Sequence, residues 1–356
     1  MSYTNGLDKP TDYFNTILFS GNSSTNNVTG VGFAPDLIWL KPRNQADNHR
    51  ILDTVRGASY FISSNKTTAE INSTANFSSF DSDGFTLIGS DTGWNATGTN
   101  QVAWNWLASN TTASNTNGDI TSTVSVNTTA GFSIVSYTGN GTLGATVGHG
   151  LGSAPSMVLV KRRNTTGNWW MYHDGLGGAD KYIVLNSTSA IGTSTNIWNN
   201  TEPTSNVFSL GDNANYPQVN GTSDTFIAYC FAEKKGFSRF GSYVGNGSSD
   251  GSYIHLGFKP AYVLTKSSSD GTKHWVCFDN KRANNFNPQN ERIMVNLSDA
   301  SAQSDTRAID FLSNGFKMRD NGTDSSAANA SGSTQIYMAF AENPFVTSTG
   351  IPTTAR

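Results

Sequence analysis

The chain has 356 residues, of which 11% are aromatic and only 14% are charged, with a formal net charge of -3. The basic residues are scattered, which excludes the electrostatic footprint expected of a nucleic-acid-binding protein. The chain has no run of about 18 apolar residues and no basic start followed by an apolar stretch, so we expect no membrane insertion and no export signal.

Residues 1–12 are polar and include Gly6 and Pro10, and we expect an arm that is ordered only by contact with another chain. Residues 346–356 are equally poor in core-forming side chains and form the matching C-terminal tail. Neither segment carries enough apolar surface to offset its own ordering entropy of roughly 1 to 2 kcal/mol per residue. The two ends therefore predict contacts with a second copy or with a neighbouring protein.

One short stretch occurs three times between these ends. A proline, placed at the start of a strand because it lacks an N–H, is followed by an apolar run that ends at a lysine. The three copies are Pro35–Lys41, Pro155–Lys161 and Pro260–Lys266. Gly-Asn turns precede them, and Asn-x-Ser/Thr-x-Ala segments and aromatic strands follow in the same order. This self-similarity predicts three tandem repeats, at 13–108, 120–235 and 236–345.

The connections between the repeats differ. Residues 109–119 contain no aromatic or large aliphatic side chain and are predicted to be a linker. The second repeat joins the third almost directly through Glu233–Gly236. We therefore expect the second and third repeats to be rigidly apposed and the first to be hinged.

Short apolar runs separated by Gly-rich turns, with almost no helical periodicity, predict an all-β chain. Three tandem antiparallel β-sandwiches of jelly-roll or lectin-like type are the preferred architecture. A closed barrel or a propeller-like arrangement is the alternative.

The residue pattern offers little for catalysis or metal binding. Cys230 and Cys277 lie at non-equivalent places and are expected to be buried free thiols. No histidine stands at ligand spacing from another histidine or a cysteine, so no metal and no cofactor are expected. His173 beside Asp174 is a possible catalytic pair, as are His274 and Asp279, but no nucleophile motif or paired glutamates accompany them. We therefore expect that the protein is not an enzyme.

Aromatic residues provide the candidate binding site. Trp169, Trp170 and Tyr172 lie in one strand, and Trp275 occupies the corresponding block of the third repeat. Because side chains alternate along a strand, one of Trp169 and Trp170 is expected to face the core, and the other to face either a neighbouring domain or solvent, where its ring can stack on a sugar. The four residues are therefore the predicted glycan contacts. Packing between domains is the alternative role for them.

The proline strands, the turn Tyr137–Gly141 and the ending Tyr337–Phe345 resemble a family of structural proteins of marine phages with lectin-like, concanavalin-like repeats. The resemblance implies a virion component assembled in the host cytoplasm. The expected function is a subunit exposed on the particle, as a tail, fibre or capsid-decorating protein, that forms homo-oligomers and attaches to host-surface glycans. A purely architectural subunit, a cell-surface or filament protein and a glycan hydrolase are the alternatives.

Overall fold

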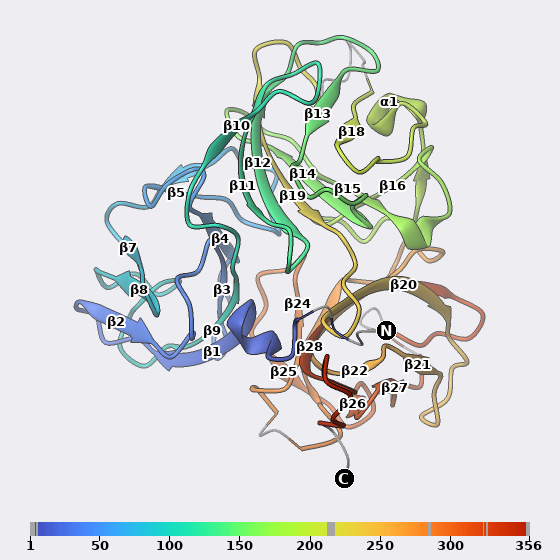
Figure 1. The fold of residues 1–356 in the computed structure, drawn as a ribbon. Helices are drawn as coiled ribbons and strands as arrows, with labels where there is room; N and C mark the ends of the chain where they lie inside the picture. Colours follow the sequence, from blue (N-terminus) through green and yellow to red (C-terminus); the bar gives the residue numbers. More distant parts are fainter. Residues whose placement is uncertain are drawn as a thin grey trace.

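A computed structural model of the chain describes Thr4 and residues 6–211, 218–283, 286–322, 324 and 327–353. Within these ranges the backbone is built from antiparallel strand pairs, with two 3-10 turns, η1 (Pro10–Asp12) and η2 (Asp174–Leu176), and one short helix, α1 (Thr195–Trp198). Figure 1 shows three lobes around a common centre, in blue, in green and in orange to red. The predicted all-β fold class is confirmed.

Each lobe contains a large sheet in which the same order of four strands occurs. The first sheet has the order β1 (Phe14–Ser20), β9 (Asn100–Trp106), β3 (Leu37–Pro42) and β4 (Arg50–Asp53). The second has β12 (Phe132–Thr138), β19 (Thr225–Phe231), β14 (Met157–Arg162) and β15 (Trp169–His173). The third has β20 (Ser238–Val244), β28 (Thr334–Pro344), β22 (Phe258–Ser267) and β23 (Val276–Asp279).

Further strands extend these sheets at their edges. The second sheet continues through β11 (Ser122–Asn127) and β10 (Ala113–Asn115) on one side and through β16 (Lys181–Val184) and β17 (Gly192–Thr193) on the other. The third continues through β24 (Glu291–Met294) and β25 (Ala302–Gln303). In the first lobe, β5 (Tyr60–Phe61) and β6 (Ile71–Asn72) form a separate pair.

A small sheet covers the outer face of each large sheet and completes a sandwich. The small sheets are β2 (Asn26–Thr29), β8 (Gly84–Leu87) and β7 (Phe77–Asp81); β13 (Thr146–Gly148) and β18 (Val207–Ser209); and β21 (Tyr253–His255), β27 (Gly315–Met318) and β26 (Ile309–Leu312). Phe85, Phe208 and Phe316 are buried in the three outer cores between the layers. We call these layer pairs the first, second and third sandwich.

The inner faces of the three large sheets enclose one central core. Along β9, Val102, Trp104 and Trp106 point to this core while Ala103 points to the outer core, as the alternation of a strand requires. The corresponding inward residues of β19 and β28 are Ile227, Tyr229 and Phe231, and Ile336, Met338 and Phe340. Trp106 meets rings from both other sandwiches, with its centroid 6.3 Å from that of Phe231 and 5.7 Å from that of Phe340. The three sandwiches therefore share a single buried interior.

The same backbone hydrogen bond closes each of the three boundaries between sandwiches. The N–H of the residue that follows the Asn-x-Ser/Thr-x-Ala segment of one sandwich donates to a carbonyl just after the lysine strand of the next. The pairs are Glu70 to Arg163 at 2.8 Å, Ile191 to Ser268 at 2.8 Å and Ser301 to Arg43 at 2.7 Å. The sandwiches thus form a closed ring rather than a row. The expectation of a hinged first repeat is wrong, because the first sandwich is bound on both sides and contributes to the central core.

The predicted linker, 109–119, is also part of the structure. It contains β10, which pairs with β11 at the edge of the second sheet. At its start, the carboxylate of buried Asp36 accepts hydrogen bonds from the backbone N–H groups of Ala108 at 2.7 Å and Asn110 at 3.1 Å. The segment lacks core-forming side chains, as predicted, but its backbone groups find partners without them.

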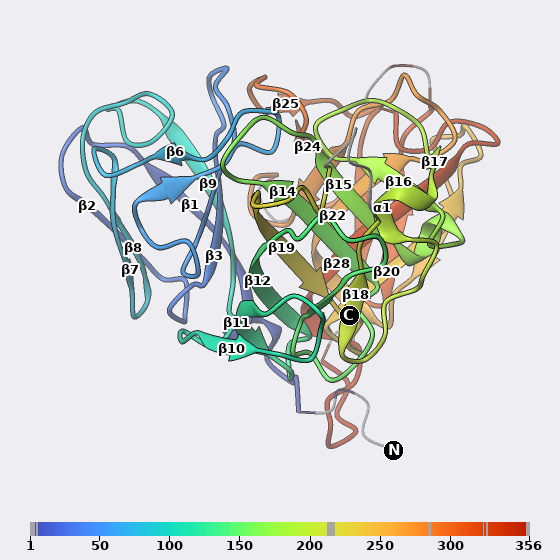
Figure 2. The ribbon, with the colours of Figure 1, turned by 90° about the horizontal axis from the view of Figure 1, so that it is seen from above.

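The chain ends pack on the same molecule. Leu7 is 1% exposed and belongs to the central core. Asp8 accepts a hydrogen bond from the backbone N–H of Ser348 at 2.6 Å, and the terminal segment folds back through a bridge between Val346 and Pro352. Figure 2 shows these first and last segments at the same end of the molecule. Within the described residues, both end segments therefore make contacts with the same chain, where contacts with a second chain were expected.

Candidate ligand-binding cleft

The four aromatic residues predicted to contact glycans are buried. Trp169 is 0%, Trp170 6%, Tyr172 4% and Trp275 2% exposed. Because β15 is covered on both faces, Trp169 packs in the central core and Trp170 in the outer core of the second sandwich. Neither of these two rings faces solvent, so the solvent alternative is wrong. The unbroken apolar run Trp169–Tyr172 is typical of a strand with two buried faces, so the sequence carried this signal.

Two of these rings serve the contact between sandwiches, which was the alternative role. The indole N–H of Trp169 donates to the carbonyl of Ser63 at 2.9 Å, and that of Trp275 donates to the carbonyl of Val184 at 3.0 Å. Both acceptors lie in a neighbouring sandwich. These rings stabilise the closed ring of sandwiches and offer no surface platform.

The histidines that were considered for catalysis are also structural. His173 is 2% exposed; its Nδ1 accepts from the N–H of Gly175 at 3.0 Å and its Nε2 lies 3.1 Å from the carbonyl of Tyr337. Burial lowers the pKa of His173 to about 4, so the ring is neutral at pH 7. His274 contacts Asn296 through Nδ1 at 2.9 Å. Neither histidine is hydrogen-bonded to the carboxylate with which it was paired in the sequence.

No group of three or more His, Cys, Asp or Glu side chains suited to a metal ion occurs within the described ranges. The carboxylate of Asp83, in the turn between β7 and β8, accepts from the backbone N–H groups of Gly30 at 3.0 Å and Gly32 at 2.6 Å. Cys230 and Cys277 are buried free thiols, as predicted. No helix in the described part of the chain is long and apolar enough to cross a membrane.

A cleft with unused polar groups lies on the third sandwich, beside the start of the first. Its first part, which we call the third-sandwich hollow, has a volume of about 140 Å³. The residues that line it include Lys259, Asn280, Phe286, Gln289, Phe311 and Glu342. Its second part, the boundary hollow, has a volume of about 180 Å³ and lies between β1 and η1 on one side and β22 and the end of β28 on the other. Asn280 and Glu342 line both hollows, which are therefore adjoining.

Two buried amide oxygens in the third-sandwich hollow lack a donor. Asn280 is 6% and Gln289 is 2% exposed, and neither Asn280 Oδ1 nor Gln289 Oε1 has a hydrogen-bond partner within the described protein. The backbone N–H of Asn280 donates to the carbonyl of Ala261 at 2.9 Å, and Nε2 of Gln289 donates to the carbonyl of Phe286 at 3.1 Å. A buried acceptor without a partner costs about 1 to 3 kcal/mol. Two residues that line the hollow thus each carry an acceptor that the described protein leaves unsatisfied.

An exposed aromatic ring borders the same hollow. Phe286 is 77% exposed, whereas Phe311 beside it is 4% exposed and forms part of the outer core. The segment is held to β26 by Asn287, whose side chain accepts from the N–H of Phe311 at 2.8 Å and donates to its carbonyl at 2.9 Å. An ion pair completes the lining, with Lys259 Nζ 2.9 Å from Glu342 Oε2. An apolar face and several polar groups therefore meet in one small space.

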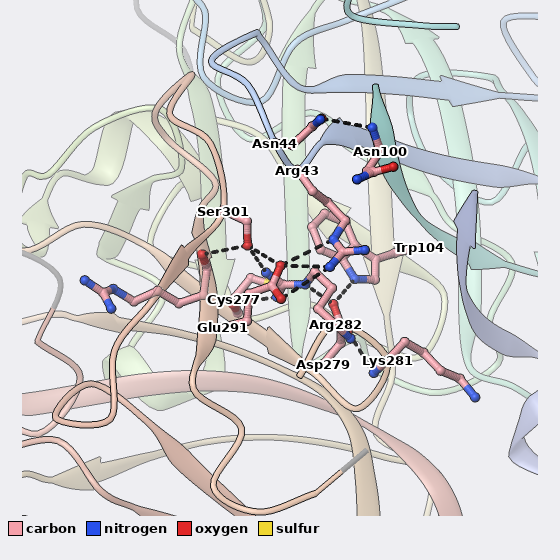
Figure 3. Close-up of polar contacts among 11 residues, drawn as sticks. Arg43, Asn44, Asn100, Trp104, Cys277, Asp279, Lys281, Arg282, Glu291 and Ser301 are labelled. Carbon is pink, nitrogen blue, oxygen red and sulfur yellow. Dashed lines mark hydrogen bonds and ion pairs between the residues drawn. The ribbon is translucent and has the colours of Figure 1, made fainter. Parts of the chain in front are cut away.

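A buried network anchors the loop that carries Asn280. Figure 3 shows Asp279 between Arg282 and Trp104. The carboxylate of Asp279 lies 2.6 Å from Nε of Arg282 and 3.0 Å from the indole N–H of Trp104, and it also accepts from the backbone N–H of Lys281 at 3.0 Å. Burial lowers the pKa of Arg282, but the attraction of Asp279 more than offsets this and the net pKa is raised. The loop is thus held rigidly against the first sandwich.

A family model covers nearly the whole chain. It matches residues 9–344 and is described as a domain of unknown function, DUF7483. The chain belongs to this family. The matched range includes every residue that lines the cleft. No curated protein and no solved structure matches the chain.

Sequence reasoning missed this cleft because its residues come from five separate segments of the chain. Asn280 and Gln289 stand in polar surroundings that resemble many other turns of the sequence. The one available signal was Phe286, an aromatic residue alone within a polar run. Its exposure became visible only with the fold.

Proposed function

We propose that the protein is a non-catalytic, glycan-binding subunit exposed on a phage particle. The observation that carries this proposal is the third-sandwich hollow, in which the exposed ring of Phe286 adjoins two buried amide oxygens without donors. A sugar presents hydroxyl donors around its edge and an apolar C–H face, and this combination matches the two kinds of group. A purely apolar ligand would leave both oxygens without a donor, which costs about 1 to 3 kcal/mol for each oxygen.

The lining favours binding over hydrolysis. Among the described residues that line the third-sandwich hollow, Glu342 is the single carboxylate, and it is paired with Lys259. Most glycoside hydrolases need two carboxyl groups that flank the scissile bond, one as the acid and the other as the nucleophile or base. A carboxylate held by an ammonium group is instead suited to accept hydrogen bonds from two neighbouring hydroxyls.

The place on a particle and assembly into homo-oligomers complete the proposal. They rest on the resemblance to marine phage proteins at Tyr137–Gly141 and Tyr337–Phe345. A single hollow of this size binds a sugar weakly. Many copies on one virion, assembled in the host cytoplasm, bring weak sites together so that attachment to host-surface glycans becomes firm through avidity.

The test screens the purified chain on a glycan array. The affinity for each sugar that binds on the array is then measured by titration calorimetry. Phe286→Ala and Gln289→Leu are expected to weaken binding by about tenfold each, because they remove the platform and an acceptor. Leu143→Ala removes an exposed side chain of the second sandwich, 61% exposed, and serves as the control. Equal binding by all three variants and the parent chain, or no binding to any sugar, would refute the proposal.

A purely architectural subunit is the second candidate, and the closed ring of sandwiches favours it. The contacts of Trp169 and Trp275 across boundaries stabilise a rigid block that needs no ligand to fulfil a structural role. A map of an intact particle separates the two: burial of the third-sandwich hollow against another protein supports the architectural role, and exposure of it on the outer surface supports attachment.

A further inference from the structure

We propose that the boundary hollow is a second subsite of the same cleft and that it takes an anionic sugar unit, so that the ligand is a chain of at least two sugars with a negative charge. This inference rests on the proposed function, since it extends the binding site of the third-sandwich hollow. The two hollows share Asn280 and Glu342, which places adjoining sugar units on either side of these two residues.

The boundary hollow has its own unused polar group. Thr16 of β1 is 3% exposed, and its Oγ1 has no hydrogen-bond partner within the described ranges. Asn280, whose Oδ1 is likewise unpaired, also lines this hollow. A buried hydroxyl can both donate and accept, whereas an amide oxygen only accepts. A sugar unit in this hollow can therefore donate a hydroxyl hydrogen bond to Asn280 and accept one from Thr16.

The charge of the lining favours an anion. Lys259 is neutralised by Glu342 at 2.9 Å, and Lys9 forms a short ion pair with Asp12. Lys281 has no ion-pair partner among the described residues, and its side chain is exposed. The cleft therefore carries one uncompensated positive charge, at the edge of the boundary hollow. A carboxylated or a sulfated sugar supplies the matching negative charge.

The backbone of Lys281 is held by the buried network beneath it. Its backbone N–H donates to Asp279 Oδ1 at 3.0 Å, and Asp279 is itself held by Arg282 and Trp104. Figure 3 shows the side chain of Lys281 extending away from this buried network. A charge on a rigid loop loses less entropy on binding than one on a mobile loop, which makes the subsite more selective.

The test compares matched disaccharides, each as a neutral form, a uronic-acid form and a sulfated form, by titration calorimetry. The anionic forms are expected to bind about tenfold more tightly than the neutral form at low salt, and added salt should reduce the difference. Lys281→Ala should abolish this preference and leave the affinity for the neutral form unchanged. Lys66→Ala removes an exposed lysine outside the cleft and is the matched control.

Thr16→Val removes the hydroxyl at nearly constant volume. It is expected to weaken the binding of disaccharides while the binding of single sugars stays unchanged. The affinities for the uronic-acid and the sulfated disaccharide, compared with each other, show which of the two anions the subsite prefers. Equal affinity for neutral and anionic forms, or a preference that survives Lys281→Ala, would overturn this inference while single sugars still bind. Failure of every sugar to bind would instead overturn the proposed function, and this inference with it.

Discussion

The indole N–H of Trp169 donates to the carbonyl of Ser63 at 2.9 Å, across the boundary between the second and first sandwiches. The same relationship occurs at the other two boundaries, where Trp275 donates to Val184 at 3.0 Å and His49 Nε2 lies 3.3 Å from the carbonyl of Met294. Nδ1 of His49 accepts from Trp39, so the proton lies on Nε2 and the ring donates to Met294. Each sandwich therefore donates to one neighbour and accepts from the other, and the contacts form a closed cycle.

Trp169→Phe should lower the free energy of unfolding by about 1 to 3 kcal/mol more than the loss of volume alone, because it leaves the carbonyl of Ser63 buried without a donor. Trp198→Phe is the matched control. Trp198 is 2% exposed, and its Nε1 has no partner within the described ranges, so this change removes the same atoms without breaking a hydrogen bond. Urea unfolding of both variants measures the difference. Equal losses of stability would contradict a stabilising role for the boundary hydrogen bond.

The buried pair of Asp279 and Arg282 predicts an unusual order of stabilities. Both side chains are 0% exposed. Arg282→Met leaves the carboxylate without its cation and should cost about 3 to 5 kcal/mol. Adding Asp279→Asn removes the stranded charge, so the double variant should be more stable than the single one. Thermal unfolding of the two variants checks this order, and the opposite order would show that the carboxylate is stabilised mainly by Trp104 and the backbone.

Much of the fold could be predicted from the sequence, because it depends on local patterns. Alternation and Gly-rich turns indicate antiparallel sandwiches wherever they occur. The closed ring could not be predicted, since the unbroken apolar run Trp169–Tyr172 indicates two buried faces but does not show which sandwich covers each face. Nor could the cleft, whose key property is an absence: Asn280 and Gln289 differ from other polar residues only in lacking partners after folding. The packing of the N-terminal segment could not be predicted either, because it depends on contacts with parts of the chain that are distant in sequence, such as that between Asp8 and Ser348.

Leu7→Ala tests the anchoring of the N-terminal segment. Leu7 is 1% exposed within the central core, so its truncation should lower the free energy of unfolding by about 2 to 5 kcal/mol. Ile351→Ala is the control, because Ile351 lies in the C-terminal segment and is 62% exposed. Thermal melts of the two variants at low protein concentration measure the effect. A melting temperature that is unchanged by Leu7→Ala and rises with protein concentration would restore the expectation that a second chain orders this segment.

Three buried lysines end the three proline strands and should make stability depend on pH. Each Nζ donates only to carbonyls: for Lys161 these are Thr67 at 3.1 Å and Arg162 at 3.0 Å. Burial lowers the pKa of Lys161 to about 7 and those of Lys41 and Lys266 to about 8, from 10.5. Above these values the folded chain binds fewer protons than the unfolded chain, whose lysines stay charged. Stability should therefore rise with pH between about 7 and 9.

Lys161→Met isolates one of these contributions. Loss of its hydrogen bonds lowers stability at every pH, but the informative quantity is the slope of the unfolding free energy against pH. Removal of a lysine that is neutral when folded and charged when unfolded should reduce this slope by up to about 1.4 kcal/mol per pH unit. Lys66→Met, at an exposed lysine, should leave the slope unchanged. Measurements are confined to pH 7 to 9, because burial raises the pKa of Tyr229 and Tyr262 well above that range and their ionisation in the unfolded chain near pH 10 would reverse the trend. If the slope of the unfolding free energy against pH is identical in Lys161→Met and in the parent chain, Lys161 stays charged in the folded chain beside its two carbonyl partners.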